Sequence, residues 1–183
     1  MGDGARNASK NRIATRAAPR YNRDMNTLDI VAMPTSDAQR VRAAMRDQFG
    51  NELTPHAADG SGPCRHCLRY AGVGEALLLF SYKPFEKAVP YQEIGPVFLH
   101  ADGCERYTSD AGFPADFRQR PLVLRPYDGS DNIQARQVYA DAGEAESAAR
   151  TLLANPDVAY VHARSRASGC FMFRIERAAG PDS

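Results

Sequence analysis

Residues 157–178 read "DVAYVHARSRASGCFMFRIERA", in which two segments of alternating side chains flank a short turn at Ala167, Ser168 and Gly169. Successive side chains of a strand point to opposite faces of a sheet. The second segment divides in this way into an apolar face and a mixed face, with Phe171, Phe173 and Ile175 on one side and Cys170, Met172, Arg174 and Glu176 on the other. We predict strands at 157–165 and 169–178, paired as an antiparallel hairpin.

A second hairpin is predicted where segments 121–127 and 132–140 flank the turn sequence "DGSD". Apolar runs at 26–33, 75–82 and 96–100 predict further strands, and the nearly continuous run at 75–82 is typical of a central strand. Parallel strands need a long crossover, whereas antiparallel strands are joined by short turns. We therefore expect an α+β fold, with a mostly antiparallel sheet of about seven strands and two main helices in a single domain.

Two segments show the helical spacing of apolar side chains. Over residues 36–49, Ser36 and Gln39 match a capping box and Gly50 is suited to end the helix. The expected buried face of this helix consists of Val41, Met45 and Phe49. A second helix is expected within 141–156, where a proline follows the apolar face made by Ala145, Ala148, Ala149, Leu152 and Leu153.

Charge is concentrated at the N-terminus of the chain, which has 183 residues and a net charge of +1. Residues 1–24 carry six basic and two acidic residues and few large apolar ones, so they predict a disordered basic tail. We expect one domain at 25–178, with Met25 as a second candidate start, and a flexible end at 179–183. The near-neutral net charge of the whole chain argues against a dedicated nucleic-acid-binding domain. The tail is interpreted as solvated, with a weak contribution to nucleic-acid binding or partner recruitment as the alternative.

The compartment is inferred from what the sequence lacks. No segment approaches the run of about 20 apolar residues that a membrane span needs, and the N-terminus has no apolar core of a secretory signal. We therefore expect a cytoplasmic protein without a membrane partner. In that reducing compartment cysteines are free, catalytic or metal-bound more often than paired in disulfides.

The four cysteines include a pair, Cys64 and Cys67, with the spacing of a zinc knuckle. Thirty-two residues separate Cys67 from His100, and Cys104 completes a C-x2-C…H-x3-C pattern. Three sulphurs and one nitrogen are a donor set that suits tetrahedral zinc. If the strands at 75–82 and 96–100 pair antiparallel, both ligand pairs meet at one sheet edge. The pattern thus predicts a structural zinc site.

Other interpretations of the cysteine pair stay open at this point. With Pro63 as a first helical residue, a short helix over 63–71 would bury Cys64 and Cys67 as small apolar side chains. A redox pair at a helix start is another alternative, because the helix dipole acidifies a thiol there. His66 is an alternative nitrogen ligand, although its place between the two cysteines makes joint ligation difficult.

Basic side chains on the final hairpin form a second candidate site. Tyr160, His162 and Arg164 share one strand face, and Arg174 is expected beside them on the partner strand. Such a cluster could bind a carboxylate or phosphate through arginine, whereas an ordinary antiparallel sheet exposes a polar face of this kind to solvent. An enzyme hypothesis combines the two sites, with Cys64 or Cys67 as the reactive thiol and Arg164 and Arg174 holding an anionic group.

From Asp29 to Arg177 the sequence resembles a bacterial family known only as domain of unknown function 1203. The resemblance rests on the blocks "CRHCLR", "LLLFSYKPF", "PYQEIGPVFLH" followed by Cys104, and "VAYVHARSRASGCFMFRIER". It implies a bacterial single-domain protein and supplies no activity, substrate or cofactor.

Overall fold

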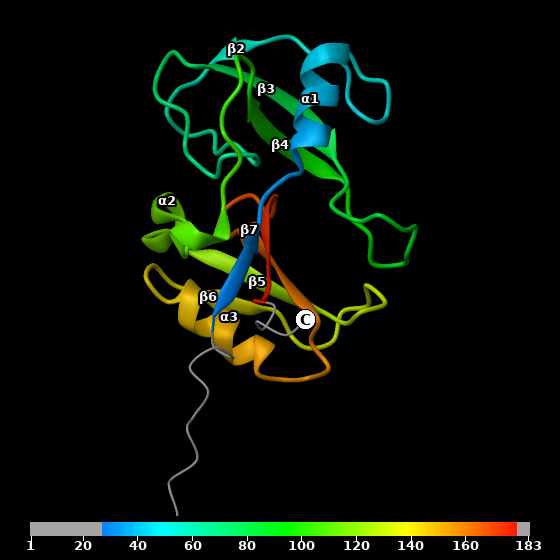
Figure 1. Cartoon of the computed structure of the whole chain (residues 1–183), viewed down its shortest axis with the longest axis vertical. Helices are drawn as coiled ribbons and strands as arrows, with labels where there is room; N and C mark the ends of the chain where they lie inside the picture. Colours follow the sequence, from blue (N-terminus) through cyan, green and yellow to red (C-terminus); the bar gives the residue numbers. More distant parts are fainter. Residues whose placement is uncertain (1–26, 179–183) are drawn as a thin grey trace, which may run out of the picture.

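The structure is a computed structural model that describes residues 27–178, so the predicted basic tail and the C-terminal end lie outside the described residues. Two antiparallel sheets form two lobes of one compact domain, which Figure 1 shows one above the other. The α+β class and the antiparallel pairing are confirmed. The division into two sheets was not predicted, because alternation along a strand does not reveal which sheet the strand joins.

The larger lobe is a five-stranded sheet in the order β1-β8-β7-β5-β6. Its strands are β1 (Leu28–Val31), β5 (Leu122–Tyr127), β6 (Val138–Ala140), β7 (Tyr160–Ser165) and β8 (Phe171–Arg177). Helix α3 (Ala145–Leu153) packs on the sheet face away from the smaller lobe, and α2 (Ala115–Arg118) contributes Phe117 to the same core. The short helix η2 (Ser109–Ala111) contacts β1. Both predicted hairpins are present, and the rings of Phe113 and Phe117 pack edge-on against the fully buried Phe173.

The smaller lobe contains the sheet β2-β3-β4, formed by β2 (His56–Ala57), β3 (Ala76–Tyr82) and β4 (Gly95–His100). Helix α1 (Thr35–Ala44) packs against it through Ala38 and Val41. Strand β3 is central, as its apolar run indicated, although Leu79 is 47% exposed because one face of this small sheet is only partly covered.

Helix α1 ends earlier than predicted, and its capping differs. Met45 has a left-handed backbone conformation (φ 45°), and the Leu53 amide then donates to the Met45 carbonyl at 2.9 Å, which closes a loop where we had expected helix. Phe49 is consequently 47% exposed and does not belong to the core. Pro34 is the N-cap residue and no side chain caps the helix, so the predicted box of Ser36 and Gln39 is wrong.

The loop after α1 is held by the buried carboxylate of Asp47. Its Oδ1 accepts the amides of Phe49 (2.9 Å) and Asn51 (3.0 Å), and its Oδ2 accepts Asn51 Nδ2 (2.8 Å) and the Ser81 amide (3.2 Å). Burial raises the pKa of Asp47, but these hydrogen bonds together outweigh it and hold the pKa below its ordinary value.

We expect Asp47→Asn to lower the free energy of unfolding by about 1–3 kcal/mol at neutral pH, because an amide nitrogen cannot accept the Oδ2 hydrogen bonds. The lowered native pKa makes this contribution complete above the unfolded-state pKa and lost as the pH falls through the native value. Urea unfolding at neutral and acidic pH measures both effects. Asp157→Asn, at an exposed position, is the matched control; equal losses in the two variants would contradict the prediction.

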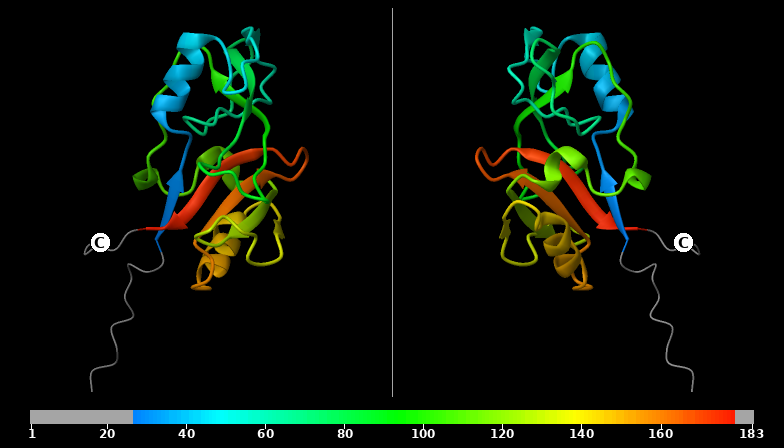
Figure 2. Two further views of the ribbon diagram at one scale, coloured as in Figure 1. Left: turned by 90° about the vertical axis from the view of Figure 1, so that its right-hand side faces the viewer. Right: turned by 90° about the vertical axis from the view of Figure 1, so that its left-hand side faces the viewer.

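The two lobes are joined by the chain and by Arg65. Figure 2 shows β1 leading from the larger sheet directly into α1. The side chain of Arg65, in the smaller lobe, donates from Nε to the Phe171 carbonyl of β8 at 2.6 Å, and its own carbonyl accepts the Met33 amide at 2.9 Å. Within residues 27–178, none of the helices has the length and apolar character that crossing a bilayer would require.

Candidate metal centre

The structure brings the four predicted ligands together. One ligand atom from each of Cys64, Cys67, His100 and Cys104 lies within 4.8 Å of every other. The antiparallel register that pairs Leu77 with His100 sets the beginning of β3 against the end of β4. The turn before β3 carries the first two cysteines, and the loop after β4 carries Cys104, so both halves meet at one edge of the small sheet.

Residues 63–70 form a tight turn, so the short helix considered over 63–71 is wrong. The Cys64 amide donates to the Arg69 carbonyl (2.9 Å), the Leu68 amide donates to the Cys64 carbonyl (3.0 Å), and Cys64 bridges to Phe98 of β4. Leu68 has φ 54°, a left-handed conformation that costs a non-glycine residue about 1–2 kcal/mol. With no helix here, the dipole invoked for a redox pair is also missing at this position.

A glycine lets this turn approach the sheet closely. A Cβ atom on Gly62 would lie 2.5 Å from Leu77 Cδ1, which is within the repulsive range. The absence of a side chain therefore allows the turn to pack directly on β3, and Cys64 becomes completely buried between them.

Two of the six distances between the ligand atoms match those of a tetrahedral metal site. Cys64 Sγ and Cys104 Sγ lie 3.7 Å apart, and Cys67 Sγ and His100 Nδ1 lie 3.4 Å apart. Tetrahedral zinc, with bonds of about 2.3 Å to sulphur and about 2.0 Å to nitrogen, separates two sulphurs by about 3.8 Å and a sulphur from a nitrogen by about 3.6 Å. The four residues could together hold one metal ion.

The three thiols interact strongly with one another. Hydrogen bonds from Cys104 and then Cys67 lower the pKa of Cys64 far below its ordinary value. Contacts with Cys104 and Cys64 raise the pKa of Cys67, and the contact with Cys64 raises the pKa of Cys104, because a second thiolate would lie beside the first. A bound cation would remove this repulsion and allow all three thiols to ionise.

Two side chains outside the ligand set contact the Cys104 sulphur. Arg42 Nη2 lies 3.4 Å from it and His66 Nδ1 lies 3.2 Å from it, while His66 Nε2 contacts Thr35 Oγ1 at 3.1 Å. His66 is therefore a neighbour of a ligand and not a member of the ligand group. Sequence reasoning missed Arg42, because a basic residue on an amphipathic helix is ordinarily solvated.

His100 lies beside an ion pair. Its Nδ1 faces Cys67, and its Nε2 lies 3.4 Å from Arg69 Nη2 and 3.5 Å from Glu75 Oε2. Arg69 holds Glu75 through two hydrogen bonds of 2.8 and 2.9 Å, and this pairing lowers the pKa of Glu75 to about 2. A carboxylate near the second ring nitrogen is a usual partner of a metal-binding histidine, and Glu75 reaches Nε2 from beside Arg69.

Within the second predicted cluster Tyr160 and His162 are buried and Arg164 and Arg174 are partly exposed, so the expected solvent-exposed polar face is wrong. His162 of β7 is 0% exposed and pairs in register with Arg174 of β8. Its ring contacts four aromatic rings, those of Phe85, Tyr127, Tyr160 and Phe171. Burial, together with the positive charges of Arg174, Arg164 and Arg125, lowers the pKa of His162 well below its ordinary value, so the ring is neutral.

The arginines around His162 already have acidic partners. Glu93, in the β3–β4 connection, forms ion pairs with both Arg125 and Arg164. Arg174 pairs with Glu176 and stacks over the Tyr160 ring, 3.7 Å from its centroid. Sequence reasoning missed Glu93, because the connection that covers this sheet face carries no strand or helix pattern.

The metal centre lies within the region that comparison with known proteins identifies. A family model described as "Protein of unknown function (DUF1203)" matches residues 61–177, more than half of the chain. The matched region contains all four candidate ligands and the final hairpin, whereas helix α1 precedes it. No curated protein and no solved structure matches the chain.

Proposed function

The chain belongs to the DUF1203 family, whose function is unknown, and we propose that this member binds a structural zinc ion through Cys64, Cys67, His100 and Cys104. The observation that carries the proposal is the ligand spacing of 3.7 and 3.4 Å, which matches the edges of a zinc tetrahedron. Three soft sulphurs and one imidazole nitrogen favour zinc over hard cations such as magnesium or calcium.

A structural role follows from the number of ligands. Four protein ligands complete the tetrahedron, whereas a catalytic zinc keeps a position open for water or substrate. The ion ties the turn at residues 63–70 to the end of β4 and to the loop that carries Cys104. These segments form no helix or strand of their own. Metal coordination would therefore hold them together and stabilise them. Cysteines that form no disulfide also fit a reducing compartment such as the cytoplasm.

The thiol-dependent enzyme remains a prediction with weaker support. It requires Cys64 or Cys67 to act beside Arg164 and Arg174. The four candidate ligands surround a common point in the smaller lobe, whereas both arginines belong to the larger sheet. Their acidic partners, Glu93 and Glu176, further reduce their capacity to hold a substrate anion.

We expect one zinc ion per chain in protein purified without chelator, measured by inductively coupled plasma mass spectrometry. Cobalt substitution should give the visible absorption of a tetrahedral site with sulphur ligands. Zinc should be released as the pH falls, because protons compete for the thiolates. His100→Gln should lose the ion and His66→Gln should retain it, since His66 lies outside the ligand group. Metal-free protein, or octahedral cobalt, would contradict the proposal.

A further inference from the structure

Cys104 differs from the other two cysteines of the metal centre in its access to solvent. It is partly exposed in the loop after β4, and both of its neighbours in the chain, Gly103 and Glu105, are exposed. Cys64 is completely buried, and the residues on either side of Cys67 are buried as well. A small reactant in solution therefore reaches the Cys104 sulphur more easily than the other two sulphurs.

The surroundings of the Cys104 sulphur are those of a reactive thiolate. Arg42 Nη2 lies 3.4 Å from this sulphur, and Arg42 Nε donates to the His100 carbonyl at 2.9 Å, which fixes the guanidinium in place. Reactive cysteines are partly exposed and lie beside a cationic side chain. Coordination to zinc would keep Cys104 ionised, so both conditions for reaction are met.

Cys64 provides a second sulphur within reach. Cys64 Sγ lies 3.7 Å from Cys104 Sγ, and a disulfide shortens such a distance to about 2.0 Å. Residues 101–108, which carry Cys104, form neither helix nor strand, so this segment can move by the required distance of less than about 2 Å. Cys67 Sγ, by contrast, contacts His100 Nδ1 at 3.4 Å. An accessible thiolate next to a second cysteine is typical of cysteines that respond to oxidants.

We propose that Cys104 is a site of oxidation by hydroperoxides, that Arg42 assists the reaction, and that Cys64 converts the product to a Cys64–Cys104 disulfide with release of the zinc ion. The inference rests on the proposed function, because the released ion is the one that the four ligands bind.

The chemistry needs one peroxide for each disulfide. The Cys104 thiolate attacks one oxygen of hydrogen peroxide, the O–O bond breaks, and the other oxygen leaves as hydroxide, to which Arg42 donates a hydrogen bond. Cys104 is then a sulfenic acid. The Cys64 sulphur attacks Cys104 Sγ, the S–O bond breaks, and a second hydroxide leaves. Two thiolates have passed two electrons to the peroxide, and two protons from solvent convert the hydroxides to water.

The disulfide keeps the smaller lobe connected after the ion has left. Cys67 and His100 alone supply half of the ligands that a structural zinc site needs. The new bond joins the turn at residues 63–70 to the loop after β4, which are segments that the ion also joins, and it links residues 40 positions apart. Such a cross-link restricts the unfolded chain. The oxidised protein should therefore unfold at a higher urea concentration than reduced protein treated with a chelator.

The test uses the full-length protein after its zinc content has been measured. Hydrogen peroxide is added in small molar excess, released zinc is followed with a colorimetric chelator, and disulfides are mapped by mass spectrometry after digestion with trypsin. Trypsin cleaves after Arg65 and separates Cys64 from Cys67, so each possible disulfide gives a different pair of peptides. We expect one zinc ion released for each Cys64–Cys104 disulfide, and reductant with added zinc should restore the starting state.

The results separate failure of this inference from failure of the zinc site itself. Protein that contains no zinc before oxidation would contradict the proposed function. Zinc-loaded protein that keeps its ion in peroxide, or that forms a Cys64–Cys67 disulfide instead, would overturn this inference alone. Dimedone, which traps sulfenic acids, should label Cys104 when it is present during oxidation. Labelling of Cys67 in its place would also overturn the inference.

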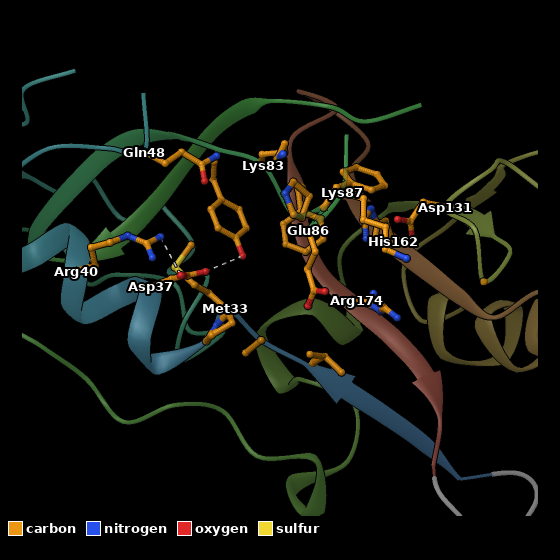
Figure 3. Close-up of a pocket in the computed structure, with 18 residues that line it drawn as sticks. Met33, Asp37, Arg40, Gln48, Lys83, Glu86, Lys87, Asp131, His162 and Arg174 are labelled. Atoms are coloured by element: carbon orange, nitrogen blue, oxygen red, sulfur yellow. Dashed lines mark hydrogen bonds and ion pairs between the residues drawn. The ribbon is translucent and has the colours of Figure 1, made fainter. Parts of the chain in front are cut away.

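Variants of two arginines on α1 test the role of Arg42, with the zinc content of each measured first. Arg42→Met should slow zinc release about tenfold, because a hydrogen bond to the departing hydroxide is lost. Arg40 lines the cavity of about 580 Å³ between the lobes and pairs with Asp37 at 2.9 Å (Figure 3), so Arg40→Met is the matched control. Arg42→Lys keeps a donor and should retain most of the rate. Equal rates in Arg42→Met and Arg40→Met would overturn the role of Arg42.

Discussion

Cys64→Ser is expected to destabilise the smaller lobe by roughly 4 kcal/mol or more, because structural zinc sites contribute about 10–16 kcal/mol of binding free energy and loss of one ligand forfeits much of it. Cys64 is completely buried and its sulphur lies 3.7 Å from that of Cys104. The measurement is urea unfolding followed by circular dichroism, with zinc content determined on the same samples. The variant should lose zinc together with stability.

Chelation and a matched cysteine variant separate zinc binding from simple packing of thiols. Cys170 lies in the β7–β8 turn outside the ligand group, so Cys170→Ser should stay within about 0.5 kcal/mol of the natural protein. A strong chelator should destabilise the natural protein and Cys170→Ser but leave Cys64→Ser unchanged. If the chelator has no effect on any of them, the cysteines are packed thiols and the zinc proposal is wrong.

Arg65→Ala is expected to lower the free energy of unfolding by about 3–5 kcal/mol, because it removes a buried cation and leaves its carbonyl partners unsatisfied. The residue is only 2% exposed. Its guanidinium donates to the carbonyls of Phe171, in the other lobe, and of Pro63. Burial lowers the pKa of Arg65 to about 10. Electrostatic interactions with Cys170, Tyr70 and Cys64 oppose this shift. The side chain therefore stays charged and joins the two lobes.

Urea unfolding measures the effect, with Arg136→Ala as the control on an exposed arginine. Arg65→Lys should restore only part of the loss, because an ammonium group does not reproduce the fork that reaches two carbonyls. Hydrogen exchange of β8 amides should increase in Arg65→Ala, since the Phe171 carbonyl loses its donor. A loss below about 1 kcal/mol would show that Arg65 does not hold the lobes together.

Features that depend on neighbouring residues could be predicted from the sequence. The β7–β8 hairpin follows from alternation of side chains around a short turn, and helix α3 follows from its apolar face and the proline after it. The ligand pairs were predictable for the same reason: each is a short local motif next to a strand, and antiparallel pairing of β3 with β4 necessarily brings the two motifs to one edge.

Features that depend on distant segments were decided only in the tertiary structure. The alternation of β7 placed His162 and Arg164 on one face but did not reveal that Phe85 and Glu93 would cover it. The contact of Arg65 with the Phe171 carbonyl likewise joins residues 106 positions apart in the chain. Local periodicity shows which side of an element is apolar. Burial and ion pairing depend on which other element packs against that side, and this is a property of the whole chain.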